Sequence, residues 1–164
     1  MNDLVYSDEF VFSLLKKINE NLVQMNRFTD EILMCSYEEL EENINKRNNY
    51  FEKVQNNYEK LKAFRTDENR EFSLIMSDKA EYALLSDSMK KVFNERKNMV
   101  RLLHEITSKD SYVQQKLSEC KDEMLERIKK LNSGNESKAS KYYANSWSSK
   151  TSNNVYIPRG NRQI

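Results

Sequence analysis

The chain has 164 residues, a formal net charge of +1, a charged fraction of 32% and a mean hydropathy of −0.90. Such a polar chain can build a core only if its apolar residues are gathered into stripes, and its length suits one domain. The first ten residues show no basic segment followed by an apolar core, and no apolar run is long enough to span a membrane. We therefore expect a cytoplasmic protein without a membrane span.

Glycine and proline are confined to the C-terminal part of the chain. Both glycines, Gly134 and Gly160, and the single proline, Pro158, follow residue 133. Strands joined by tight turns use glycine for positive φ and proline to fix the backbone, so this distribution predicts long helices with short connections. It also excludes glycine-rich phosphate-binding loops and strand-to-helix nucleophile turns from most of the chain, and we do not expect an enzyme.

The first predicted helix covers residues 8–34. Its apolar residues recur at alternating steps of four and three, and only Thr29 interrupts the series. The phase of the apolar stripe then shifts by one residue, which requires the helix to stop and restart. Ser36 and Glu39 form an S-x-x-E capping box at that point, so we predict a tight turn at residues 35–36.

Two further helices are predicted in the same way, over residues 37–76 and 79–131, separated by a second tight turn at 77–78. Two places inside them leave a break open. These are residues 65–69 and residues 107–111, where a break would create a fourth helix. The unbroken phase of the stripe favours continuity at both.

The predicted fold is an all-α antiparallel bundle of three long helices, a bundle or coiled-coil domain that covers residues 1–132. Because the third predicted helix is longer than its neighbours, residues 118–131 have no helical partner within the chain. Several of them are apolar, so another protein should cover them. The predicted client-binding residues on this helix are Val113, Leu117, Cys120, Met124, Ile128 and Leu131.

Residues 133–164 are predicted to form a flexible, disordered tail. Gly134 is expected to stop the preceding helix, and the segment is rich in Ser, Asn and Lys. Large aromatic residues in a polar tail are typical docking anchors, which makes Tyr142, Tyr143 and Trp147 candidate anchors. The alternative is an unstructured tail with incidental aromatics. A flexible linker of roughly ten residues would let the anchors fold back over the client-binding residues.

The sequence offers no constellation for catalysis, a metal or a cofactor. His104 is the single histidine, which is too few for the H-E-x-x-H zinc motif. Cys35 and Cys120 lie far apart without a C-x-x-C motif and are expected to be free thiols. No helix carries the one-signed basic face that nucleic-acid binding requires.

Three charged residues interrupt the apolar stripes: Arg47, Arg96 and Asp110. Burying a charge costs several kcal/mol unless it is paired. Either these residues form ion pairs between helices and fix the helix register, or each sits where its stripe faces water. The sequence leaves both readings open.

Two stretches resemble a known family. Residues Ser36 to Val54 read SYEELEENINKRNNYFEKV, and the segment from His104 to Tyr143 begins HEITSKDSYVQQKL and ends KASKYY. They are similar to the small all-helical flagellar export chaperones of the FliT and FlgN types. In these proteins a short break precedes a Glu-rich second helix with an internal arginine, and a long later helix leads to a polar end bearing tyrosine.

The resemblance implies a cytoplasmic chaperone that binds an unassembled filament-cap or hook-associated protein. It would keep this client from polymerising and deliver it to the export apparatus and its ATPase machinery. The alternative is a self-associating coiled-coil scaffold or adaptor, in which a homodimer mate covers the long helix. Neither reading involves nucleic acid.

Overall fold

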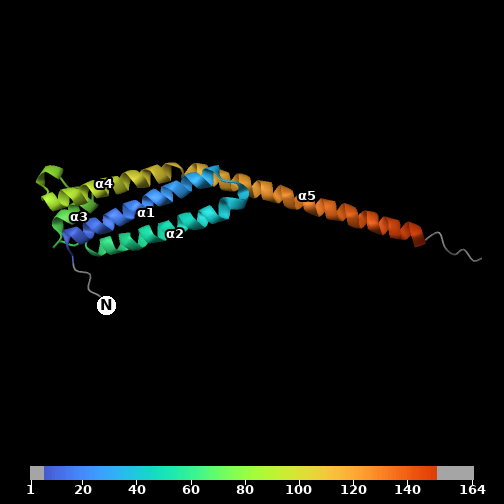
Figure 1. Ribbon diagram of the computed structural model, residues 1–164, viewed down its shortest axis with the longest axis horizontal. Coiled ribbons are helices and arrows are strands. Elements are labelled where there is room, and N and C mark those ends of the chain that lie inside the picture. Colours follow the sequence, from blue (N-terminus) through green and yellow to red (C-terminus); the bar gives the residue numbers. More distant parts are fainter. Residues whose placement is uncertain (1–5, 151–164) are drawn as a thin grey trace, which may run out of the picture. The chain divides into compact units, whose positions relative to one another are not determined.

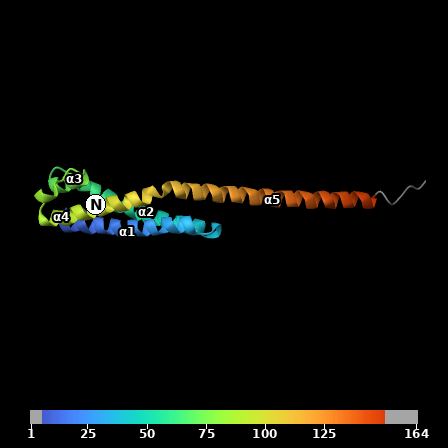
Figure 2. The same cartoon turned by 90° about the horizontal axis from the view of Figure 1, so that it is seen from above.

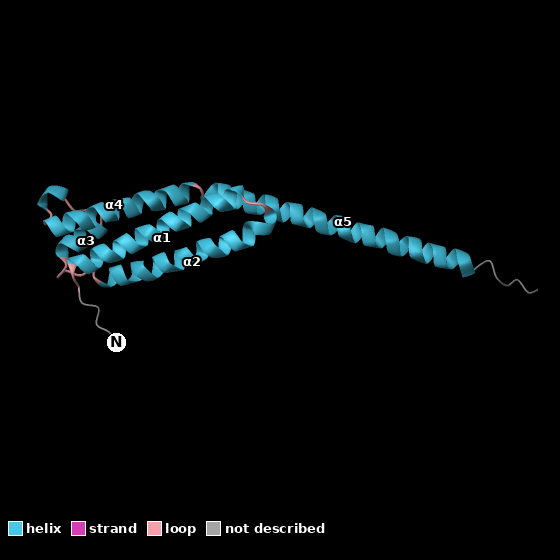
Figure 3. Ribbon diagram, viewed as in Figure 1, coloured by secondary structure: helices cyan, strands magenta, loops and turns pink. Residues whose placement is uncertain are grey.

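The computed structural model describes residues 6–150, except for the side chains of residues 135–137, 139–140 and 142–150. Within this part of the chain all regular structure is helical, which confirms the predicted all-α class (Figure 3). The chain divides into two compact units, Met1–Leu117 (unit 1) and Ser118–Ile164 (unit 2). The elements are α1 (Asp8–Met34), α2 (Tyr37–Ala63), α3 (Arg70–Met76), the 3-10 helix η1 (Tyr82–Leu84), α4 (Asp87–Ser108) and α5 (Asp110–Lys150).

The first predicted turn is confirmed. α1 begins after Ser7, whose side chain accepts a hydrogen bond from the Phe10 amide at 3.1 Å, and it ends at Met34. Ser36 precedes α2, and its backbone amide donates to Glu39 Oε2 at 3.2 Å as part of the predicted capping box. The two helices are therefore separated by two residues whose local hydrogen bonds replace those of a continuous helix.

The predicted continuity through residues 65–69 is wrong, because α2 ends at Ala63 and α3 begins at Arg70. Polar side chains hold the intervening backbone in another conformation. Asn69 Nδ2 donates to the Phe64 carbonyl at 3.0 Å, and Ser73 Oγ donates to the Thr66 carbonyl at 2.8 Å. Such bonds compete with helix continuation even where the apolar phase is unbroken.

The helix break at residues 77–78 is confirmed, but the next long helix begins at Asp87 and not at residue 79. Asp78 has a φ of 57°, and the Lys79 amide donates to the Leu74 carbonyl at 2.9 Å. A residue with positive φ followed by such a bond commonly ends an α-helix. The connection to α4 then passes through η1. Ser86 closes it, since its hydroxyl donates to Glu71 Oε2 at 2.8 Å.

The chain also breaks at Lys109, so the fourth helix that the sequence left open is present. The hydroxyls of Thr107 and Ser108 donate to main-chain carbonyls of α4, at 2.9 Å to Leu103 and at 2.7 Å to Glu105. The Ser108 bond satisfies the Glu105 carbonyl, to which the Lys109 amide would donate in a continuous helix. Here that amide donates to the Ile106 carbonyl at 3.0 Å. The predicted preference for continuity at 107–111 is therefore wrong.

In unit 1, α1 packs against both α2 and α4, whereas α2 and α4 make little direct contact with each other (Figures 1 and 2). Phe28 stacks on Tyr50 with 5.7 Å between ring centroids, and Phe10 meets Phe64 edge-on at 5.8 Å. The start of α1 thus lies beside the end of α2, so these helices are antiparallel, as short connections require.

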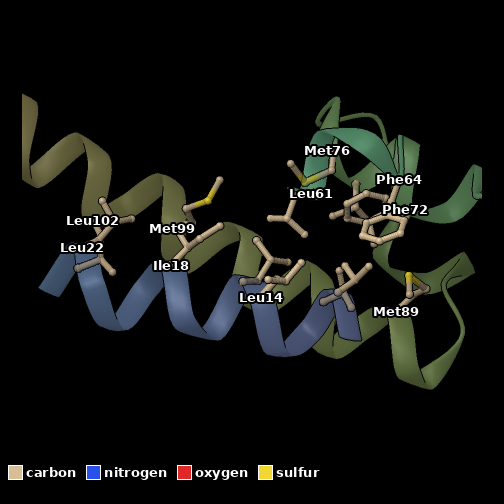
Figure 4. Close-up of a cluster of buried hydrophobic side chains, with 14 of the residues drawn as sticks. Leu14, Ile18, Leu22, Leu61, Phe64, Phe72, Met76, Met89, Met99 and Leu102 are labelled. Carbon is tan, nitrogen blue, oxygen red and sulfur yellow. The ribbon is translucent and has the colours of Figure 1, made fainter. Parts of the chain in front are cut away.

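α4 runs parallel to α1 and antiparallel to α2. Asn19 Nδ2 donates to the Glu95 carbonyl at 3.0 Å, and further along Lys109 Nζ donates to Asn26 Oδ1 at 2.9 Å. With a neighbour on each side, α1 is buried over a broad face, which forms the centre of the core (Figure 4). The buried core residues include Val11, Leu14, Leu15, Ile18, Leu22, Met25, Leu61, Phe64, Phe72, Ile75, Met76, Met89, Val92, Met99, Leu102 and Ile106.

Residues that interrupt the predicted apolar stripes meet in the folded chain. Arg47 Nε donates to Thr29 Oγ1 at 2.9 Å, and Arg47 Nη2 lies 3.2 Å from Asp110 Oδ1. Thr29 is fully buried, and its hydroxyl donates to the Met25 carbonyl at 2.8 Å. The structure therefore favours the paired reading of Arg47 and Asp110, and α1, α2 and the first turn of α5 are joined at this point.

Arg96, the third such charged residue, is also paired. Its Nη2 lies 3.4 Å from Asp78 Oδ2, and its side chain is only 13% exposed. Asp78 is the residue with positive φ at the end of α3. This ion pair therefore joins α4 to the turn that precedes it.

Substitutions at the neighbouring residues Leu22 and Val23 can test which side of α1 packs into the core. Leu22 is fully buried, whereas Val23 is 49% exposed. We expect Leu22→Ala to lower the free energy of unfolding by about 2–5 kcal/mol through loss of burial and a residual cavity. Val23→Ala should change it by less than about 1 kcal/mol. Urea denaturation followed by circular dichroism measures both. Equal effects, or a larger effect for Val23→Ala, would mean that α1 presents another face to the core.

Candidate functional site

The predicted client-binding residues divide into covered and exposed side chains. Val113 and Cys120 are 8% and 6% exposed, so their side chains are not available to a partner. This corrects the predicted set, which included both. Periodicity identified them as members of an apolar stripe, but it does not report which parts of a stripe are covered. Leu117, in unit 1, is 38% exposed.

The remaining residues form an exposed apolar surface on the part of α5 that lies in unit 2. Met124 is 41% exposed, Ile128 45% and Leu131 67%. The structure adds Leu125, 45% exposed, which the predicted set omitted. Positions i, i+1, i+4 and i+7 share one side of a helix. We call this surface the α5 strip, made by Met124, Leu125, Ile128 and Leu131.

The α5 strip has no helical neighbour within its own unit, because the described residues of unit 2 form the single helix α5. An isolated helix in water gains little stability from its own hydrogen bonds and normally depends on packing of its apolar side. Lys121, three residues before Met124 and four before Leu125, adds a positive charge on the same side. The surface suits a partner that supplies apolar contacts together with negative charge.

The helix stop expected at Gly134 is not found, since α5 continues to Lys150. A glycine ends a helix when it adopts positive φ, which Gly134 does not. The flexible linker needed for fold-back of the tail is therefore helical instead. Tyr142 lies on the same helix as Leu131, about 16 Å further along its axis, and so cannot turn back over the α5 strip.

The side chains of the candidate anchors Tyr142, Tyr143 and Trp147 lie outside the described residues. The last fourteen residues, 151–164, lie outside them as well. The proposed anchoring role of these aromatics therefore stays a prediction.

A groove of about 670 Å³ lies beside the α1–α2 turn and was not predicted. Its cations are paired: Arg27 lies 2.9 Å from Glu31, and Lys46 lies 2.6 Å from Glu42. The hydrogen bond and charge of Lys46 hold the pKa of the Glu42 carboxyl below its usual value. Met34, 87% exposed, supplies an apolar edge. The groove is lined by Val23, Asn26, Arg27, Asp30, Glu31, Met34, Cys35, Glu39, Glu42, Asn43 and Lys46.

A second exposed apolar surface lies on the side of unit 1 where Arg47 meets Asp110. On α2, Phe51 lies one turn after Arg47 and is 49% exposed. On α4, Leu103 precedes Asp110 by two turns and is 38% exposed, and Val100 is 43% exposed. Since α2 and α4 make little contact, neither covers the other. We call the exposed residues Phe51, Val100 and Leu103 the α2–α4 face.

Among the residues that the structure describes, the histidine and the two cysteines form no metal site. His104 is exposed on α4, and no group of three or more His, Cys, Asp and Glu side chains suited to a metal occurs among the described residues. Cys35 and Cys120 are free thiols, as expected. Within residues 6–150, no helix combines the length and the apolar character that crossing a bilayer requires.

No protein-family model, curated protein or solved structure matches this chain.

The different burial of the two cysteines can be checked directly by their reactivity. Cys35 is partly exposed and Cys120 is buried. In native buffer we expect Cys35 to react with a thiol reagent at least about tenfold faster than Cys120, because modification requires access to the sulfur. The variants Cys35→Ser and Cys120→Ser assign the two rates, and both thiols should react fast in urea. Equal native rates would contradict the burial of Cys120.

Proposed function

We propose that this chain is a cytoplasmic export chaperone that binds an unassembled filament-cap or hook-associated protein of the flagellum. The observation that carries the proposal is the α5 strip, an apolar surface exposed on a helix that has no helical neighbour in its unit. The resemblance of residues 36–54 and 104–143 to the FliT and FlgN types names the class of client. In this class the chaperone also delivers its client to the export ATPase machinery.

The α5 strip suits capture of an amphipathic helix. Its side chains project from one side of a helix, so a client helix laid along it would bury apolar residues of both partners. Burying three side chains contributes about 1.5–3 kcal/mol each, which is a major part of the roughly 8 kcal/mol of a micromolar complex. A client helix covered in this way is no longer available for polymerisation.

The competing proposal is a scaffold in which α5 pairs with α5 of another copy. The same exposed strip supports it, because a homodimer would also cover the apolar residues. Lys121 argues against the parallel form of this pairing, since it would face Lys121 of the partner helix in the apolar seam. Like charges at such positions destabilise a helical pair.

The triple variant Met124→Ser, Ile128→Ser, Leu131→Ser tests the chaperone proposal. We expect at least a hundredfold weaker binding to the client, because three apolar contacts are lost, with helix content retained. Binding to recombinant filament-cap and hook-associated proteins of the source organism is measured by calorimetry, and helix content by circular dichroism.

Lys130→Ser, on the opposite side of α5, is the matched control and should bind like the unmodified chain. Absence of binding to every filament-cap and hook-associated protein would overturn the proposal. So would unchanged client affinity in the triple variant.

A further inference from the structure

A small cavity lies in unit 1 where the end of α3, the connection that follows it and α4 meet (Figure 1). Its volume is about 140 Å³, and an apolar cavity of about 150 Å³ is large enough to hold benzene. The cavity therefore has room for one small chemical group. It is lined by Ile75, Asp78, Ala80, Phe93, Arg96 and Lys97.

Part of the lining is apolar and well supported. Ile75 is buried in the core, and Ala80 and Phe93 pack against that core. The ring of Tyr82 lies 5.4 Å from the ring of Phe93, centroid to centroid, and Lys97 Nζ lies 4.7 Å from the centroid of the Phe93 ring. An aliphatic or aromatic group fits against these side chains, with an ammonium group close by.

The lining also contains a guanidinium group with few acceptors. The Arg96 side chain is 13% exposed, and its Nε is buried without a hydrogen-bond partner. Its Nη2 lies 3.4 Å from Asp78 Oδ2, which is longer than an ordinary N–H···O hydrogen bond. A guanidinium group buried in this way is favourable only when further acceptors approach it.

The charges that line the cavity have a positive sum. Arg96 and Lys97 supply two cations, and Asp78 supplies one carboxylate. Lys79 and Glu81, which belong to the same connection, are exposed and carry opposite charges, so they leave this balance unchanged. An anion therefore fits this cavity better than a neutral or cationic group.

We propose that this cavity binds a carboxylate attached to a small apolar group. The apolar group lies against Ile75 and Phe93, and the carboxylate accepts hydrogen bonds from Arg96 and Lys97. A planar carboxylate matches the donors of a guanidinium group. Free carboxylic acids and chain ends whose last residue is apolar share this chemistry. The proposal does not depend on the export function proposed above.

Asp78 competes with such a ligand, because its own carboxylate contacts the same guanidinium group. The Asp78 side chain is 72% exposed, so water weakens its interaction with Arg96. Asp78 has a φ of 57°, a backbone conformation that asparagine also adopts readily. Asp78→Asn therefore removes the competing charge while keeping the turn.

Binding can be measured on the full-length chain by NMR titration of the arginine Nε–H signals. Arg96→Gln identifies the Arg96 signal, and the exposed Arg101 of α4 gives a reference signal. The probes are benzoate, a free acid, and N-acetylleucine, which reproduces an apolar chain end. Benzamide and N-acetylleucinamide are the matched uncharged controls, and sodium chloride controls for ionic strength.

We expect at least one of the two carboxylates to shift the Arg96 signal saturably below about 10 mM, with the Arg101 signal unchanged. The carboxylate that binds more tightly identifies the source of the ligand. Asp78→Asn should strengthen binding about threefold, because a competing charge is removed. Lys97→Gln should weaken it about threefold, because a charge at the opening is lost.

Three results would overturn the proposal. Neither carboxylate could shift the Arg96 signal saturably. The uncharged probes or sodium chloride could shift it as strongly as the carboxylates, which would exclude recognition of the carboxylate. Asp78→Asn could leave the affinity unchanged or lower it, which would mean that the ligand does not meet the guanidinium group. No client is present in this experiment, so its failure leaves the chaperone proposal to its own test.

Discussion

A guanidinium group placed in an apolar helix stripe must be paired, and in this chain the pairing of Arg47 determines how three helices meet. Arg47 reaches the buried Thr29 of α1 on one side and Asp110 at the start of α5 on the other. Because the two contacts join α2 to different helices, they fix the position of α2 along its axis relative to α1 and to the start of α5. Next to them, Lys109 pairs with Asp30 of α1 at 2.5 Å. The positions of the exposed apolar residues on α2 and α4 follow from this register.

The parts of the fold that periodicity and capping determine could be predicted from the sequence. α1 matches its predicted range, and the turn at Ser36 follows its capping box. The C-terminal end of α2 and the start of α4 could not be predicted, because side chains such as Asn69 bond to nearby carbonyls without disturbing the apolar phase. The predicted end of the last helix at Gly134 was wrong for a related reason. A glycine ends a helix in this way only when its backbone adopts positive φ.

The candidate site was predicted in part. The length of the last helix pointed to the exposure of Met124, Ile128 and Leu131, and all three are exposed. Val113 and Cys120 share their stripe but are buried, because a stripe defines a side of a helix and not what lies against it. The α2–α4 face was not predicted. Phe51 belongs to a regular apolar stripe, and such a position is normally in the core. Its exposure follows from the small contact between α2 and α4, which the sequence pattern does not show.

The register of α2 against the start of α5 depends on the Arg47–Asp110 pair, and a double-mutant cycle measures that interaction directly. Free energies of unfolding are compared for the unmodified chain, Arg47→Met, Asp110→Asn and the double variant. We expect a coupling energy of about 0.5–2 kcal/mol between the two positions, above the roughly 0.3–0.5 kcal/mol of an exposed pair such as Arg27 with Glu31. Additive effects of the two substitutions would show that the pair does not hold α2 in register with α5, and would contradict the account.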